Sequence, residues 1–444
     1  MQLSTGRSHH EPIQTRHRMG SAIVSRGRPM RGHPLLWIAC LLPVIAPADE
    51  RTLSLEEAVD HALREAPQVA ASAATRDAAW AVAPSAGRLP DPELVTGVDN
   101  LPISTAERFS FTRDFMTMRK IGVMQTFPNR EKRRLQSARA EREIAVAQGE
   151  LRKTRYDTAR AVAEVWIARA TAEESLARLK SLQPESDLQA AAARAALASG
   201  TASATEALTA QSMVAALDER ILALQQDAEM QRAELARWIG ADAERPLAGI
   251  PSDLDLGTTP EALVSAVPQH PPLAPVVAKL AEARTDVELA RAAKRPDWSA
   301  ELDYAQRGPD FSNMVSLEFR IGLPLFAKHR QNPIIAEKLA MVHAREAERD
   351  AEVRMHTAEI QVELVQWRRG RERLQHYATD LLPLARDRSR TALASYSAGR
   401  GDLRGAIDAL TQDVNTQLEY VQLEGSVARA WAFLHFLHGS GGAP

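Results

Sequence analysis

Polar and apolar residues follow a helical spacing over most of the chain. Residues 53–83 have this pattern with a break near Pro67. Small apolar residues recur every three or four positions from residue 140 to 182, and again from 210 to 238. This is the heptad pattern of coiled coils. It predicts a helix from about residue 131 to 198, roughly 100 Å long at 1.5 Å per residue, with a kink at Pro184.

Four short segments alternate with a period of two, which is typical of β-strands. The clearest is Met314–Ile321, followed by Trp298–Tyr304 and, with weaker alternation, 93–100 and 117–127. In the first of these segments one face carries Val315, Leu317, Phe319 and Ile321, and the other carries Ser316, Glu318 and Arg320. Such a strand fits a soluble sheet with one face in a core, or an outer-membrane barrel with lipid outside and water inside. The alternation alone leaves both open.

The chain repeats itself. Residues 199–210 match residues 398–409 at an offset of 199 without a gap, and Leu89–Asp91 and Thr126–Pro128 recur as Arg295–Asp297 and Gly322–Pro324. Each half therefore reads as helix, two strands, long helix, glycine turn and helix, with repeats expected at 49–250 and 251–444. Four strands cannot close a barrel, for which about eight are needed. We therefore expect the chain to oligomerise with cyclic symmetry.

The N-terminal region has the pattern of an export signal. Six arginines precede the apolar run of residues 34–48, which ends in Ala46-Pro47-Ala48, a typical cleavage site. The signal is more typical if translation begins at Met30. Cys40, the only cysteine, lacks the residues of a lipobox, so we predict no lipid anchor. Cleavage of residues 1–48 would remove six arginines and one glutamate and change the net charge from −2 to −7.

The composition excludes several classes of function. The 444 residues are 45% hydrophobic and 25% charged, and no basic block indicates nucleic-acid binding. The HExxH, Walker A and G-x-S-x-G motifs are absent from the sequence, so we predict no enzyme and no cofactor. Apart from the export signal, no segment reaches 18 uncharged apolar residues, so we predict no transmembrane helix.

Few residues suggest a metal site. Met116, Met118 and Met124 have thioethers that could bind soft metals, but their strand spacing favours packing or contact with lipid. His435 and His438 are three apart, but their aromatic neighbours also favour packing. We therefore predict no metal site.

The full-length duplicated pattern, over residues 51–440, resembles the TolC-like outer-membrane factor family. The Tyr396–Gly399 turn, followed by Asp402 and residues 406–409, is similar to the family's periplasmic-tip motif. A second set of segments resembles the heavy-metal (CusC/CzcC-type) branch: Pro90–Glu93, Asp99–Pro102, Phe109–Met118 and Ile121–Pro128.

The resemblance implies a fold, partners and a location. Three chains would form a 12-stranded β-barrel in the outer membrane of a Gram-negative bacterium, continued by a coiled-coil α-barrel across the periplasm. The partners would be outer-membrane lipid, a periplasmic adaptor (membrane fusion protein) and an inner-membrane RND-type pump. The duct would export heavy-metal cations. The alternatives are a duct for drugs or other small molecules, and a soluble periplasmic coiled-coil adaptor or scaffold.

The two glycine turns are the main candidate sites. Gly200 and Gly399 are expected to end helices, and with Tyr396 they would form the tip that contacts the adaptor; a plain helix–helix turn is the alternative. Asp408, Glu206 and, less strongly, Asp402 follow these turns. In a trimer each would form a ring of three carboxylates that attracts cations. The alternative is a solvated helix face, or an N-cap in the case of Asp402. The apolar face of Val315, Leu317, Phe319 and Ile321 would meet lipid.

Overall fold

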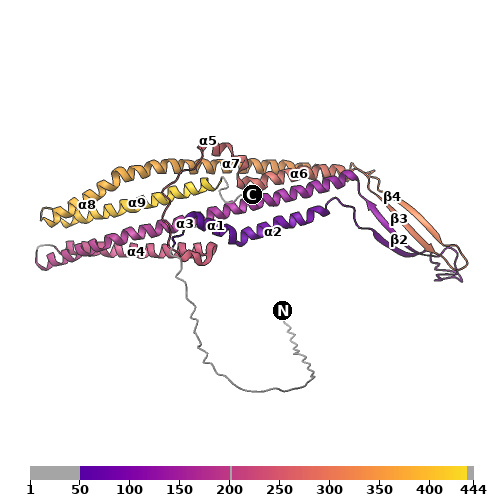
Figure 1. The fold of residues 1–444 in the computed structure, drawn as a ribbon, viewed down its shortest axis with the longest axis horizontal. Coiled ribbons are helices and arrows are strands. Elements are labelled where there is room, and N and C mark those ends of the chain that lie inside the picture. Colours follow the sequence, from indigo (N-terminus) through magenta and orange to yellow (C-terminus); the bar gives the residue numbers. More distant parts are fainter. Residues whose placement is uncertain (1–50, 201–202, 438–444) are drawn as a thin grey trace, which may run out of the picture. The chain divides into compact units, whose positions relative to one another are not determined.

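The computed structural model describes residues 51–200 and 203–437. The predicted signal peptide with Met30 and Cys40, and His438, lie outside these residues. Figure 1 shows long helices that run alongside one another, with the strands continuing from their ends.

Each half of the chain supplies the same order of elements, with one exception. The first half has α1 (Leu55–Glu65), α2 (Pro67–Val82), β1 (Glu93–Asp99), β2 (Met118–Phe127), α3 (Arg130–Ala198) and α4 (Ala204–Ile239). The second has α5 (Pro260–Ser265), α6 (Ala274–Ala292), β3 (Trp298–Gln306), β4 (Met314–Ile321), α7 (Gln331–His376), α8 (Leu382–Ser397) and α9 (Leu403–Phe436). The exception is that α7 and α8 together take the place of the single helix α3. The break at Pro67, all four strands and the long helix are confirmed.

The two repeats differ in how the long helix continues past a proline. Pro184 lies inside α3, which continues through it as one helix of 69 residues, so the proline does not end the helix. Pro383 stands 199 residues later as the second residue of α8, and a π-helix, η5 (Tyr377–Leu381), joins α7 to α8. A proline removes one backbone donor from a helix. The two repeats thus accommodate the same missing donor in different ways.

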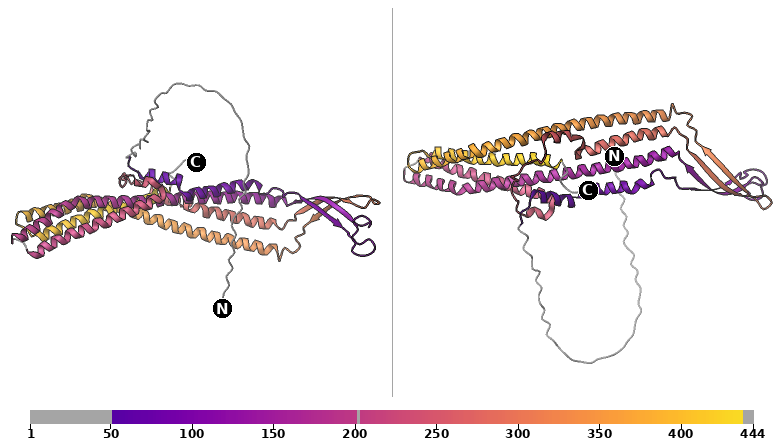
Figure 2. Two further views of the ribbon diagram at one scale, coloured as in Figure 1. Left: turned by 90° about the horizontal axis from the view of Figure 1, so that it is seen from below. Right: turned by 45° about the horizontal axis from the view of Figure 1, so that its top comes forward.

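The helices lie in two side-by-side sets that share α3. Near the strands the order is α2, α3, α6, α7; toward the far end it is α4, α3, α9, α8. The views in Figure 2 agree with this layering. None of the helices in the described ranges has the length and hydropathy needed to span a membrane.

The largest core cluster lies where these sets meet. It contains Trp166, Trp431 and Phe433 together with residues of α1, α4 and α7. The connection between the repeats is fixed there by two indole N–H groups: Trp367 donates to the Leu254 carbonyl and Trp431 to the Asp255 carbonyl, both at 2.8 Å. The buried side chain of Arg169 donates to the carbonyls of Ala243 (2.6 Å) and Arg245 (3.0 Å) beyond the end of α4. Hydrogen bonds from two tryptophans and one arginine thus fix the segments that follow α4 against the core.

The strands form one antiparallel sheet in the order β1-β2-β3-β4. Glu93 pairs with Met124, Phe127 with Trp298, and Trp298 with Ile321. Next to the helices β2, β3 and β4 therefore reach the same level, whereas β1 begins three residues short of it. The two edges of the sheet are β1 and β4. This part of the fold prediction, a mainly helical chain of two repeats with four strands, is confirmed.

Close approach of helices depends on glycine at Gly149. A Cβ on this residue of α3 would lie 2.8 Å from the nitrogen of Pro275 and 2.9 Å from the carbonyl carbon of Ala274, at the start of α6. Both obstacles are backbone atoms, so they cannot move aside as a flexible side chain can. The position therefore sets the spacing of α3 and α6.

We expect Gly149→Ala to lower the free energy of unfolding by about 1–3 kcal/mol, the usual cost of overpacking. Gly322→Ala is the matched control, because a Cβ there meets nothing closer than the Asp297 carbonyl oxygen at 3.8 Å. Thermal denaturation of the detergent-purified protein measures both. Equal melting temperatures for the two variants would contradict the role given to Gly149.

Candidate functional site

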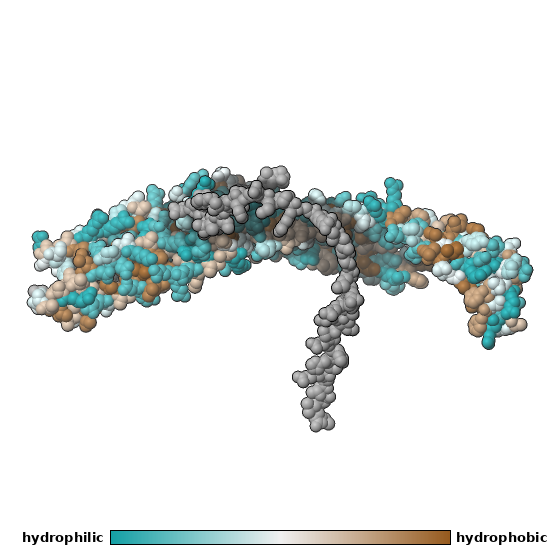
Figure 3. Space-filling model, turned by 60° about the horizontal axis from the view of Figure 1, so that its bottom comes forward, coloured by the Kyte–Doolittle hydropathy of each residue, from teal (hydrophilic) through white to brown (hydrophobic). Residues whose placement is uncertain are grey.

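The sheet has one apolar face. The strand register places on this face residues that are largely apolar and exposed in the single chain: Leu94, Val98, Ile121, Val123, Trp298, Leu302, Tyr304, Val315, Leu317, Phe319 and Ile321. Four polar residues share this face: Thr96, Gln125 and, at the end of the sheet farthest from the helices, Arg119 and Gln306. Leu317 is 63% exposed and Val315 70%. Figure 3 shows hydrophobic side chains gathered at the end of the molecule that carries the strands. The four β4 residues singled out from the sequence belong to this larger surface.

The opposite face carries a network of charges that crosses all four strands. The Nζ atom of Lys120 lies 3.5 Å from Asp99 and 3.9 Å from Glu301. Arg320 contacts Glu301 at 2.6 Å and Glu318 at 2.7 Å. Glu301 is only 3% exposed, so its partners offset the cost of burying its charge. A sheet with one apolar and one charged face is typical of a wall between lipid and water.

At the far ends of the helices the two glycine turns have the same backbone conformation. Gly200 has φ +74° and Gly399 has φ +68°, and a Cβ on either would meet nothing within 4 Å. The glycine is therefore required by the left-handed backbone alone. The Gly399 N–H donates to the Tyr396 carbonyl at 2.9 Å, and the Gly200 N–H to the Leu197 carbonyl at 3.1 Å. Both turns end their helices as the sequence predicts.

Two of the acids proposed for the pore serve the helix starts. Asp402 accepts a hydrogen bond from the Gly405 N–H at 3.3 Å, which makes it the N-cap of α9. Glu206 accepts from the Ser203 N–H at 2.7 Å and completes a capping box at the start of α4. Ser203 and Asp402 are 199 residues apart, so they are equivalent caps. The pattern Ser203-x-x-Glu206 is the sequence signature of such a box, and it could have been found from the sequence.

The structure brings several of the predicted residues together. A cavity of about 430 Å³ is lined by Glu206, Tyr396, Gly399 and Asp402, with Ala196, Ser397, Gly401 and Leu403. A hydrophobic cluster beneath it joins α3, α4 and α9 through Ala193, Ala210 and Ile407. The two turns therefore form one packed tip. Asp408 lies outside the cavity, exposed on α9 between the buried residues Ile407 and Ala409.

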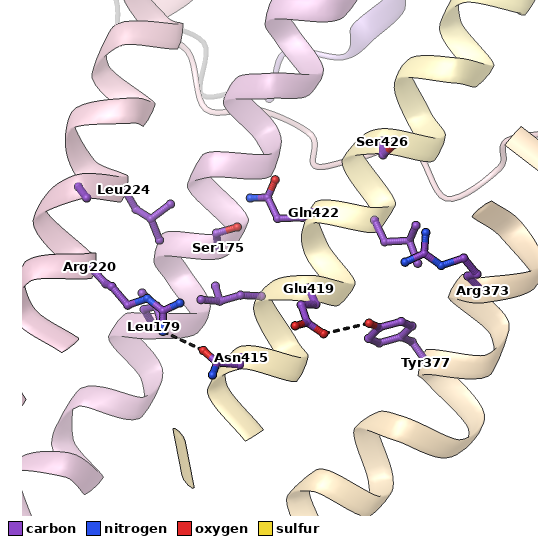
Figure 4. A pocket seen from close by; sticks show the side chains of 13 residues that line it. Ser175, Leu179, Arg220, Leu224, Arg373, Tyr377, Asn415, Glu419, Gln422 and Ser426 are labelled. Carbon is purple, nitrogen blue, oxygen red and sulfur yellow. Dashed lines mark hydrogen bonds between the residues drawn. The ribbon is translucent and has the colours of Figure 1, made fainter. Parts of the chain in front are cut away.

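A groove between the same helices, farther from the tip, was not predicted from the sequence. It has a volume of about 990 Å³ and is lined by α3, α4, α9, the end of α7 and the start of the π-helix. Figure 4 shows Arg220 and Asn415 on one side and Tyr377 and Glu419 on the other. Arg220 donates to Asn415 Oδ1 at 2.9 Å, and the Tyr377 hydroxyl donates to Glu419 Oε2 at 3.0 Å. Its lining combines helices of both repeats, so no local sequence signal could have indicated it.

The groove and Asp408 share one face of α9. Asp408, Asn415, Glu419, Gln422 and Ser426 are spaced by seven, four, three and four residues, which keeps them on one side of a helix. This α9 stripe is polar throughout its length. It extends from the tip cavity toward the large core cluster.

Two further sequence interpretations concern metals. His435 stacks on Trp431 with ring centroids 4.5 Å apart, as expected for a packed histidine. Met118 and Met124 lie on the charged face of the sheet, whereas Met116 lies in the loop before β2. Among residues 51–200 and 203–437 no group of three or more His, Cys, Asp or Glu side chains is placed to hold a metal ion.

A two-faced sheet on long paired helices is the structure of an outer-membrane channel protein. The outer membrane efflux protein family matches residues 58–241 and 262–440, and the chain belongs to this family. The family consists of transport proteins rather than enzymes, and its members lie in the outer membrane, as the sequence predicts. The chain is thus the outer-membrane channel of a tripartite efflux system.

Solved structures share the fold at low sequence identity. VceC from Vibrio cholerae has 18% identity and a TM-score of 0.73, over 87% of this chain and 96% of that one. CusC has 15% identity and a TM-score of 0.72, over 87% and 92%. CmeC from Campylobacter jejuni has 14% identity and a TM-score of 0.72, over 87% of both chains. No match is found among curated protein sequences.

A half-buried carboxyl group on α9, Glu424, leads to a pH-dependent prediction. Desolvation raises the pKa of Glu424 above its usual 4.5, and the charge of Glu174 adds to this, against the opposing effects of Tyr420 and Arg178. The folded chain therefore holds this proton more tightly than the unfolded chain. The contribution of Glu424 to stability is then greatest below pH 4.5 and falls as pH rises through the raised pKa.

Glu424→Gln replaces the carboxyl with a neutral amide, so the variant does not lose stability at this position as the pH rises. We expect the melting temperature of the variant to exceed that of the unmodified protein at pH 7, and the difference to shrink toward pH 4. Glu229→Gln, an exposed acid on α4, is the control and should show no such trend. A difference that grows as the pH is lowered would have the wrong sign for a carboxyl with a raised pKa.

Proposed function

We propose that three copies of this chain form a passive duct that carries heavy-metal cations from the periplasm and an inner-membrane pump to the exterior. The observation that carries the proposal is the incomplete closure of the single chain. Its sheet is two-faced but has two free edges, and its helix layer has two apolar edges. Both features fit a chain that supplies one third of a closed tube.

The sheet edges require partners. An edge strand carries a row of unpaired N–H and C=O groups, and each costs several kcal/mol in lipid. β1 and β4 have seven and eight residues, so the β4 edge of one copy can pair with the β1 edge of the next along nearly its full length. Three copies would give 12 strands. The apolar face would then meet lipid and the charged face would line the lumen.

The helix layer has a matching pair of edges. On α7, exposed small or apolar residues recur at helical spacing: Ala340, Ala344, Ala347, Ala351, Met355, Ala358, Val362 and Val365. We call this the α7 seam. On α2 the same spacing gives an exposed α2 seam: Ala71, Ala74, Ala78 and Ala81. Small residues at such positions allow helices to pack closely.

The two seams lie at the same height along the helices. Contacts across α2, α3, α6 and α7 link them in one level: Val69 with Leu151, Glu150 with Lys279 at 2.6 Å, and Arg284 with Glu346 at 2.9 Å. In one chain α3 and α6 separate α2 from α7. The seams can therefore meet only when the α7 of one copy packs against the α2 of another.

The α9 stripe would face the interior of the tube. Asp408 is then the acid best placed for a ring of three carboxylates, because it has no capping role. Glu206 and Asp402 remain weaker candidates, since both carboxylates already bind backbone N–H groups. The packed tip with Gly200, Gly399 and Tyr396 would contact a periplasmic adaptor. We propose repeats at 49–250 and 251–444, preceded by a signal peptide at 1–48.

The substrate class rests on residues 90–128, whose segments resemble the heavy-metal branch. These residues form β1, β2 and the long loop between them. Drugs and other small molecules are the alternative substrates. CusC, VceC and CmeC resemble the chain to similar degrees, so structural similarity does not favour the heavy-metal branch over the others. A soluble adaptor or scaffold is disfavoured by the exposed apolar face of the sheet, which nothing else in the described chain covers.

Deletion of the gene in its native host tests the substrate. We expect lower minimal inhibitory concentrations for transition-metal ions, with little change for hydrophobic drugs, and recovery on complementation. Sensitivity confined to drugs would overturn the cation assignment while leaving the duct in place.

The lipid-facing side of the sheet can be tested by placing a charge on each face. Leu317→Arg puts a cation in the middle of the apolar face, at a cost of about 2–4 kcal/mol in a bilayer, so we expect poor recovery of the protein from the outer membrane. Ser316→Arg is the matched control, because Ser316 pairs with Asp303 on the charged face. Equal recovery of both variants in fractionation would argue against the assigned faces.

Asp408 can be tested by removing its charge while keeping its shape. We expect Asp408→Asn and Asp408→Ala to assemble normally and to lower the cation selectivity of single channels, because a carboxylate ring attracts cations. Asp402→Asn serves as the comparison and should change selectivity less. Unchanged selectivity in both Asp408 variants would place this residue on the outer, solvated surface.

A further inference from the structure

The two repeats differ where a strand passes into a long helix. In the first repeat only residues 128 and 129 separate β2 from α3, whereas nine residues, 322–330, separate β4 from α7. We call residues 322–330 the junction segment. Its sequence is Gly-Leu-Pro-Leu-Phe-Ala-Lys-His-Arg. The fold does not require this length, since the first repeat makes the same passage without it.

The first part of the junction segment is apolar and exposed. Leu323 is 66% exposed, Leu325 75% and Phe326 69%. These residues follow Ile321, the last member of the apolar sheet face. Ile321 pairs with Trp298, whose ring stacks on Phe127 at 4.1 Å. The junction segment thus extends the apolar face beyond the aromatic pair Trp298 and Phe127. Such aromatic residues are typical of the edges of membrane barrels.

The last part of the junction segment is basic and exposed. Among the described residues, neither Lys328 nor Arg330 forms an ion pair, and His329 stands between them. The equivalent basic residues of the first repeat are engaged: Lys132 pairs with Asp297 at 2.7 Å and Arg134 with Glu131 at 2.6 Å. The second repeat therefore presents two cations that no carboxylate of the described chain neutralises.

The junction segment has a defined backbone. The Gly322 N–H donates to the Asp297 carbonyl at 3.0 Å and the Leu325 N–H to the Leu323 carbonyl at 2.9 Å. The His329 N–H donates to the Phe326 carbonyl at 3.0 Å, and the Asn332 N–H to the Ala327 carbonyl at 2.8 Å. These bonds hold the apolar and basic parts at a fixed spacing of one turn. A surface of this kind is pre-organised for a partner.

We propose that the junction segment binds anionic phospholipid at the periplasmic surface of the outer membrane. Leu323, Leu325 and Phe326 enter the acyl boundary, and Lys328 and Arg330 bind headgroup phosphates. Apolar residues beside basic ones are typical of interfacial anchors, and Lys and Arg next to a membrane surface attract anionic lipid. The inference rests on the proposed trimeric duct, which sets the membrane level at this end of the sheet.

The alternative occupant is a neighbouring copy of the chain. The junction segment follows β4, which is an edge strand, so a second protomer comes near it in any closed ring. The charges favour lipid, because the apolar and basic parts follow in the order expected from acyl chains to headgroups. The experiment below separates the two occupants.

The test uses the full-length protein in nanodiscs of equal phosphatidylethanolamine and phosphatidylglycerol, released and analysed by native mass spectrometry. We expect the retained lipid to be enriched in phosphatidylglycerol. Lys328→Gln combined with Arg330→Gln should reduce this enrichment on the order of tenfold. Arg388→Gln combined with Arg390→Gln, which removes two exposed charges from α8, should leave it unchanged. Equal enrichment in all three proteins would overturn the proposal.

A second measurement follows the apolar part. A fluorophore on Leu325→Cys, in a Cys40→Ala background, should be quenched by spin-labelled lipid. Efficient cross-linking of Leu325→Cys between protomers without quenching would assign the segment to a subunit contact instead. Particle mass and conductance are recorded on the same samples. A conducting trimer without lipid preference refutes the lipid site alone, and the absence of a membrane particle refutes the duct as well.

Discussion

The need to pair every backbone group in lipid is the constraint on which the rest of this structure depends. A sheet of four strands has two edges whose N–H and C=O groups lack partners, and a bilayer offers no water to satisfy them. The chain does not fold its own edges together, because four strands are too few to close a barrel. We propose that copies of the chain close the sheet, and the edge helices have matching surfaces that would pack in the same arrangement.

Duplication explains how one chain supplies both membrane and periplasmic parts. Each repeat provides two strands and one helical hairpin, and equivalent residues keep equivalent roles: Gly200 and Gly399 end helices, and Ser203 and Asp402 begin them. The repeats have also diverged. The second has a π-helix before Pro383 and a nine-residue passage from β4 to α7. The first difference lies beside the polar groove, and the second lies where the sheet passes into the helices.

Most of the fold could be predicted from the sequence, because it follows from local periodicity. Strand bounds such as Met314–Ile321 follow from alternation, and the helix at 130–198 follows from the heptad pattern. The offset of 199 residues indicated the duplication. Pro184 does not end α3, which continues through it, and the kink expected there stays a prediction. The π-helix at 377–381 could not be predicted, because a proline has more than one way to be accommodated in a helix.

The candidate site was less predictable, because it depends on contacts between distant residues. Gly399, Tyr396, Glu206 and Asp402 were singled out and do meet at the tip. The N-cap role of Asp402 was one of the two interpretations of the sequence, whereas the capping box of Ser203 and Glu206 was missed although its signature is local. The charge network from Asp99 to Arg320 and the groove around Tyr377 arise from four strands and four helices. No local pattern encodes them.

The central claim, that copies of this chain close into a three-membered ring, is tested most directly by a disulfide between the two seams. Ala78→Cys on α2 and Ala347→Cys on α7, in a Cys40→Ala background, lie at the same level but are separated by α3 and α6 within one chain. Oxidation of membranes containing this double variant should give covalent trimers on denaturing gels, and each single variant should stay monomeric. Monomers alone, at this pair and at neighbouring pairs along both seams, would contradict the account.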